Sequence, residues 1–87
     1  MSKENVGTFL LNGETLVIQE EYGVRNASIS WVSGTVTVKG TMKLGIRDSD
    51  VITLNATNPI LNISFDFSID GYTLDATAGQ ALVVTGR

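Results

Sequence analysis

The chain contains no cysteine and no histidine. Without cysteine it can form neither disulfides nor thiolate metal sites. Without histidine it lacks the commonest transition-metal ligand and the usual general base, and its serines and threonines have no imidazole to activate them. The composition therefore predicts a protein that is not an enzyme and that binds no metal or cofactor.

The chain also lacks long apolar runs and a surplus of basic residues. Its longest apolar run is Ala81 to Val84, far short of a membrane span, and the segment Met1 to Asn5 is polar, unlike a secretory signal. Six basic residues stand against nine acidic ones, for a net charge of −3, whereas a nucleic-acid-binding surface needs a basic face. We expect no membrane and no nucleic acid as partner, and synthesis in a cytoplasm.

The length of 87 residues predicts one domain, residues 1–87. A domain of this size buries only a little over about 60% of its unfolded surface, so a lone copy is marginally stable. Small domains usually compensate with disulfides, metals or partners. Because this composition leaves association most open, we expect a homo-oligomer.

Apolar and polar residues alternate along most of the chain, which is typical of strands with one dry face. In the stretch 35–44, Val36 and Val38 share a face opposite threonines and lysines, and residues 61–70 repeat the pattern. Further strands are expected over residues 8–11, 14–20, 27–32, 51–55, 72–77 and 81–86. In the last of these we expect Leu82 and Val84 to belong to the core.

Three dipeptides between these runs are typical of two-residue turns: Asn12-Gly13, Ser33-Gly34 and Asp70-Gly71. They predict consecutive hairpins, with Trp31 opposite Val36 across the second turn. The expected fold is all-β, a small antiparallel β-sandwich of about seven or eight short strands, Ig-like or jelly-roll-like.

The first predicted hairpin carries large apolar residues on both faces. If Asn12-Gly13 is its turn, Phe9 lies opposite Leu16 on one face, while Leu10 and Val17 share the other. Either a second layer covers this outer face or it is a subunit interface, because exposed apolar strands are a liability unless paired or covered.

The charged candidates are Lys39, Lys43, Asp66 and Asp75. A turn at Asp70-Gly71 places Asp66 opposite Asp75, and like charges in that position repel each other. Solvent, a different register or a partner's basic residue would relieve the repulsion. We interpret these residues, with the two lysines on one strand face, as the charged rim of an interface.

Two further candidates are weaker. Asp48-Ser49-Asp50 begins like a calcium loop, but the sixth position is Thr53 and the twelfth is Pro59, so we predict no metal site there. Tyr22 lies in a connection between strands, and we expect it to be the exposed aromatic residue of the chain. With Tyr72 it could line a groove for a glycan.

Two stretches of the chain, residues 27–40 and residues 70–86, show a pattern of glycine, threonine and aliphatic residues. They resemble a strand pair and a closing hairpin of small β-rich structural proteins of tailed bacteriophages. The resemblance covers about half of the chain and carries no catalytic residues.

The resemblance implies a virion component: a capsid-decorating or head-fibre-associated subunit, or else a neck or tail part. Its expected partners are other copies of itself and a major capsid or other virion protein, and its expected location is the virion. A glycan-binding module is the alternative from another class. We predict that Leu10 and Val17 anchor the interface, with Tyr22 exposed beside it.

Overall fold

The structure is a computed structural model that describes residues 7–19, 23–42, 51–65 and 69–86. All regular structure in these residues is β-strand, and every pairing is antiparallel. The six strands are β1 (Gly7–Asn12), β2 (Thr15–Gln19), β3 (Asn26–Met42), β4 (Ile52–Leu54), β5 (Ile60–Ser64) and β6 (Ile69–Gly86). The predicted all-β antiparallel class is confirmed, with two long strands among the six.

The long strands β3 and β6 pair with each other along nearly their whole length, from Asn26 opposite Gly86 to Met42 opposite Ile69. β1 pairs with the C-terminal half of β6, and β2 with its N-terminal half. In the same way β5 pairs with the first half of β3, and β4 with its second half. Each short strand therefore covers one half of a long one.

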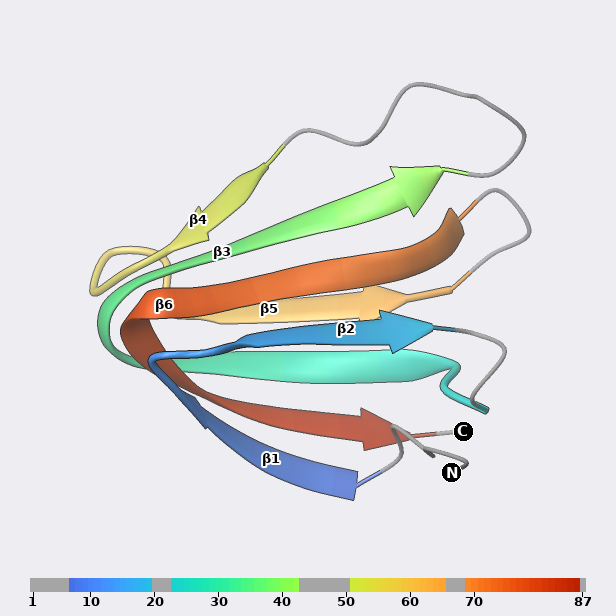
Figure 1. The fold of residues 1–87 in the computed structure, drawn as a ribbon, viewed down its shortest axis with the longest axis horizontal. Helices are drawn as coiled ribbons and strands as arrows, with labels where there is room; N and C mark the ends of the chain where they lie inside the picture. The colour runs from blue at the N-terminus through green and yellow to red at the C-terminus, as the bar shows by residue number, and fades with distance from the viewer. Residues whose placement is uncertain (1–6, 20–22, 43–50, 66–68, 87) are drawn as a thin grey trace.

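Both long strands bend in the middle, so the sheet folds over itself into two layers (Figure 1). We call β1, the C-terminal half of β6, the N-terminal half of β3 and β5 the first layer. The second layer is β2, the N-terminal half of β6, the C-terminal half of β3 and β4. Strands that pass from one layer to the other at a bend are a recognised way to close a sandwich.

Glycines allow this bend. Gly34 of β3 lies opposite Gly79 of β6, and Gly34 has a φ of +69°, which L side chains rarely adopt. Gly13, with a φ of +72°, connects β1 to β2, and its N–H donates to the carbonyl oxygens of Ala76 (3.0 Å) and Gly79 (3.2 Å). The chain thus turns at neighbouring points on three adjacent strands, which we call the corner.

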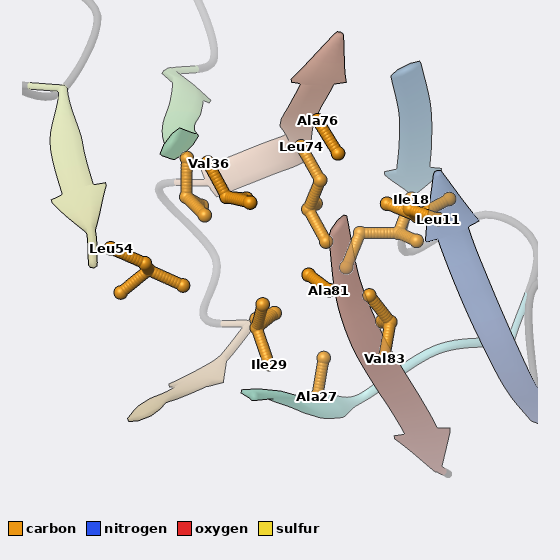
Figure 2. Packing of buried hydrophobic residues seen from close by; sticks show 11 residues of the cluster. Leu11, Ile18, Ala27, Ile29, Val36, Leu54, Leu74, Ala76, Ala81 and Val83 are labelled. Carbon is orange, nitrogen blue, oxygen red and sulfur yellow. The ribbon is translucent and has the colours of Figure 1, made fainter. Parts of the chain in front are cut away.

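The core lies between the two layers. Ile29 and Val83 of the first layer and Val38 and Leu74 of the second are at most 1% exposed, and Figure 2 shows residues of this cluster reaching into the space between the strands. Among the described residues, the buried cluster contains Leu11, Ile18, Ala27, Ile29, Val36, Val38, Leu54, Leu74, Ala76, Ala81 and Val83.

The prediction that Leu82 and Val84 belong to the core is wrong. Their exposed fractions are 38% and 46%, while Ala81 and Val83 are fully buried. All four residues of this run are apolar, so alternation alone could not tell which pair points inward.

Two predicted hairpins are also wrong. β1 and β2 do not pair with each other: Phe9 lies opposite Val83 and Leu16 opposite Leu74, both on β6. β3 runs through Ser33-Gly34 without reversing, which places Trp31 opposite Ala81. The positive-φ glycines that suggested hairpin turns are used to bend the sheet.

The third predicted turn, Asp70-Gly71, lies inside β6, where Gly71 pairs with Gln19 on one side and Thr41 on the other. The stretch 70–86 that resembled a closing hairpin is therefore part of one bent strand. Asp75 lies opposite Thr15 and Thr37, and Asp66 is outside the described residues, so the expected Asp66–Asp75 opposition is replaced by threonine neighbours.

Candidate functional site

The outer face of the first layer carries a row of large aliphatic side chains. Leu10 of β1 lies opposite Leu82 of β6, Leu82 lies opposite Ser30 of β3, and Ser30 lies opposite Ile60 of β5. Leu10 is 56% exposed and Ile60 is 59% exposed. Directly opposed side chains lie about 5 Å apart, so this row forms one continuous surface across four strands.

A second row runs beside the first, two residues along each strand. Thr8 lies opposite Val84, Val84 opposite Ser28, and Ser28 opposite Asn62. We call the outward side chains of both rows the apolar face: Thr8, Leu10, Ser28, Ser30, Ile60, Asn62, Leu82 and Val84. None of these eight side chains is charged.

The outer face of the second layer has a different chemistry. One row across it is Thr15, Asp75, Thr37 and Thr53, and the next contains Val17, Thr73 and Lys39. We call these seven residues the threonine face. Hydroxyl groups and both signs of charge make it a polar surface, in which Val17, 47% exposed, is the large aliphatic residue.

Asp75 is held by its own strand. The backbone N–H and the hydroxyl of Thr77 both donate to Asp75 Oδ1, at 2.9 and 2.7 Å. The hydroxyl bond and then the backbone bond lower the pKa of the Asp75 carboxyl below its ordinary value. These bonds lie beside the bulge between β6 and β3 at Thr35–Thr37, so Asp75 supports local backbone geometry at the edge of the corner.

The structure separates the two predicted anchors. Leu10 and Val17 follow each other on β1 and β2, but these strands lie in different layers, so the two side chains are on opposite outer faces. Both are exposed, as expected for surface residues. The prediction that they form one surface is wrong, because Gly13 turns the chain from one layer into the other.

Of the charged candidates, Lys39 and Asp75 lie in adjacent rows of the threonine face. Lys43, Asp66 and Tyr22 are outside the described residues. Tyr72, the second aromatic of the glycan alternative, is half-buried, and its ring packs edge-on against that of Phe65 with 5.2 Å between centroids.

Sequence reasoning missed Ile60, Leu82 and Val84 as surface residues. Leu82 and Val84 alternate with Ala81 and Val83, and all four residues are apolar. The sequence pattern therefore permits either pair to face outward. Ile60 has no partner in the sequence pattern, because only the sheet order places it in the same row as Leu82, with Ser30 of β3 between them.

Within the described residues the structure has no pocket and no cluster of metal-ligating side chains. No helix that could cross a membrane is found in that part of the chain either. Comparisons of the chain with protein-family models, with curated proteins and with solved structures gave no match.

Proposed function

We propose that this protein is a non-enzymatic structural subunit of a tailed-phage virion, a capsid-decorating or auxiliary head protein that stabilises the particle by protein–protein contacts. The observation that carries the proposal is the apolar face, on which Leu10, Leu82 and Val84 are exposed beside one another and Ile60 is exposed beyond the serines of β3. Exposed apolar patches rimmed by polar residues are typical of protein-interaction sites.

The two stretches that resemble phage structural proteins support the proposal by their composition alone, because each lies on one bent strand and they do not form the strand pair and closing hairpin of the resemblance. The stretches 27–40 and 70–86 lie on β3 and β6, which pair through both layers and supply Leu82, Val84, Ser28 and Ser30 to the apolar face. The resemblance and the exposed surface thus concern the same two strands.

A contact through the apolar face is weak for a single copy and suits a subunit that is present in many copies. Full burial of a large aliphatic side chain contributes about 1.5–3 kcal/mol, and these four are already roughly half-buried, so further burial adds about 1 kcal/mol each. The total of about 4 kcal/mol only reaches the lower end of the cost of association, about 4–15 kcal/mol. One copy would bind weakly, whereas many copies on a particle gain from multivalency.

Sedimentation with phage particles tests the proposal. Purified chain is mixed with particles of the phage that encodes it, separated into heads and tails, and each fraction is run on a density gradient. Co-sedimentation with heads is the expected result. Co-sedimentation with tails alone would replace it with the neck or tail alternative, and absence from both fractions together with binding on a glycan array would overturn it.

A matched pair of variants ties the binding to the face. Leu10→Asp places a charge on the apolar face, and Val17→Asp places the same charge on the threonine face at a similarly exposed position. We expect Leu10→Asp to reduce occupancy of heads at least about tenfold, because a charge buried in an apolar contact loses its hydration. Val17→Asp serves as the control with unchanged occupancy.

A further inference from the structure

The apolar face has small side chains beside large ones. Leu82 and Val84 of β6 project outward, and Ser30 and Ser28 lie directly beside them on β3. Beyond the serines, Ile60 of β5 is again large and 59% exposed. From β1 to β5, the side chains of the first row are therefore large, large, small and large.

This order of side-chain sizes fits against a second copy whose strand order is reversed. If two such faces meet so that β6 of one copy lies over β3 of the other, Leu82 and Val84 of each β6 lie over the two serines of the opposite β3. The same superposition places Leu10 of each copy over Ile60 of the other. Large side chains then meet small ones at the centre, and aliphatic ones meet each other at both sides.

Charge permits the same occupant. The chain has a net charge of −3, so two copies repel each other except where charges are kept apart. All eight side chains of the apolar face are uncharged, whereas Lys39 and Asp75 lie on the threonine face of the other layer. A basic partner would gain nothing from an uncharged face, but a second copy of an acidic chain needs one.

We propose that the apolar face is occupied by a second copy of this chain, in a face-to-face dimer whose two-fold axis runs parallel to the strands, between β6 and β3. The interface is isologous, with the same residues contributed by both copies. The inference rests on the proposed function: on a particle, the contact that the apolar face makes is one between neighbouring copies of the chain.

The size of the face sets the affinity. Four strands at about 4.8 Å spacing and two rows at about 7 Å spacing give a flat area of roughly 20 by 14 Å. Stable interfaces bury about 800 Å² on each partner, about three times that area. We expect a dissociation constant of about a millimolar, so the dimer forms only where copies are concentrated.

Analytical ultracentrifugation of the purified chain from about 10 µM to about 1 mM is the first test. A monomer–dimer equilibrium is expected in that range, and a monomer throughout would overturn the inference. Leu82→Asp should raise the dissociation constant at least about tenfold. Val17→Asp should leave it unchanged, and an equal effect of the two variants would exclude the apolar face as the interface.

Since Leu82 is only 38% exposed, Leu82→Asp must first be shown to fold by its circular dichroism spectrum. If it does not, Leu10→Asp at 56% exposure replaces it, with the same expected loss of dimer.

Cross-linking tests the orientation. The chain has no cysteine, so Leu10→Cys and Ile60→Cys each introduce a single thiol. Facing sheets lie about 10 Å apart, a distance that a short bismaleimide can bridge. An equimolar mixture of the two variants should give a cross-linked dimer, and each variant alone should give little. A dimer from Leu10→Cys alone would mean that β1 faces β1, which contradicts the proposed axis.

Results in solution and on particles separate this inference from the proposed function. A chain that stays monomeric but co-sediments with heads refutes the dimer and keeps the virion role, with another protein on the apolar face. A dimer that binds no particle fraction confirms the inference and refutes the virion role.

Discussion

Gly34 and Gly79 lie opposite each other where β3 and β6 bend from one layer into the other. A Cβ on Gly34 would collide with the carbonyl oxygen of Ala78 and lie 2.7 Å from the Cα of Gly79. A Cβ on Gly79 would lie 2.6 Å from the carbonyl oxygen of Ser33. The two backbones approach so closely that neither position has room for a side chain.

Gly34→Ala should therefore destabilise the fold by about 3 kcal/mol or more, since left-handed strain of about 1–2 kcal/mol adds to a collision with backbone. Gly13→Ala is the matched control: Gly13 has almost the same φ, +72°, but nothing within 4 Å of the added Cβ. It should cost only about 1–2 kcal/mol. Urea denaturation of both variants measures the difference, and equal losses would contradict the close approach at the corner.

Val83 and Val84 are neighbours of the same type with opposite environments, 0% and 46% exposed. Val83→Ala should cost about 2–3 kcal/mol of unfolding free energy, because it removes two buried methyl groups and leaves a cavity. Val84→Ala should cost less than about 1 kcal/mol in the monomer. Thermal unfolding at low protein concentration checks this order, and the reverse order would mean that the C-terminal half of β6 faces the other way.

The Asp75 carboxyl is expected to titrate below the ordinary range because Thr77 donates two hydrogen bonds to it. Thr77→Ala removes the hydroxyl donor and should move the pKa of Asp75 up toward the ordinary value of an aspartate. Thr77→Ser keeps the hydroxyl and should keep the lowered pKa. Carbon-detected NMR of the Asp75 carboxyl over pH 2 to 6 measures both.

The sign of the accompanying stability change follows from the same shift. A folded-state pKa below the unfolded one stabilises the fold above the unfolded pKa, and this contribution is lost as pH falls through the folded pKa. The wild-type chain should therefore lose more stability than Thr77→Ala between pH 5 and pH 2. An identical acid dependence of the two proteins would show that the Thr77 hydroxyl does not act on Asp75.

Trp31 reports on the corner. Its indole N–H donates to the carbonyl oxygen of Gly34 at 2.8 Å, and its backbone N–H donates to that of Pro59 at 2.7 Å. Trp31→Phe keeps a ring but removes the indole donor, and should cost about 1 kcal/mol beyond the change in packing. Chemical denaturation followed by circular dichroism measures the loss, and no loss would mean that water replaces the bond without penalty.

Much of the strand layout could be predicted from the sequence, because alternation is a local property. Residues 8–11, 51–55 and 81–86 were expected as strands and lie within or around β1, β4 and β6. The break expected between residues 77 and 81 is the bend in β6. Pro59, which has no N–H to donate to a strand ladder, lies directly before β5, which begins at Ile60.

The pairing of those strands could not be predicted, because a hairpin turn and a sheet corner have the same local signature. Gly34 supplies a positive φ that suits either one, and either one changes which residues face the core. Before Ser33-Gly34 the inward residues have odd numbers, as Ile29 does, and after it they have even numbers, as Val36 and Val38 do. Either arrangement explains that change. What decides between them is the distant strand β6, whose Gly79 lies against Gly34.

The candidate surface was predictable only in part for the same reason. The sequence places Leu10 on the outer face of residues 8–11, and the structure shows that side chain exposed. Its neighbour Leu82 is 72 positions away in the chain and Ile60 is 50 away, so their meeting depends on the sheet order. An interface built across four strands has no counterpart in any single segment of sequence.

The continuous β3–β6 ladder has one more consequence. Both layers have the same two strands at their centre, so neither layer has a seam along which it could detach while the other persists. Amide protons along this ladder should exchange with solvent only when the whole molecule opens, with similar slow rates on both sides of the bend. A subunit built in this way should unfold cooperatively, with both layers lost in one step.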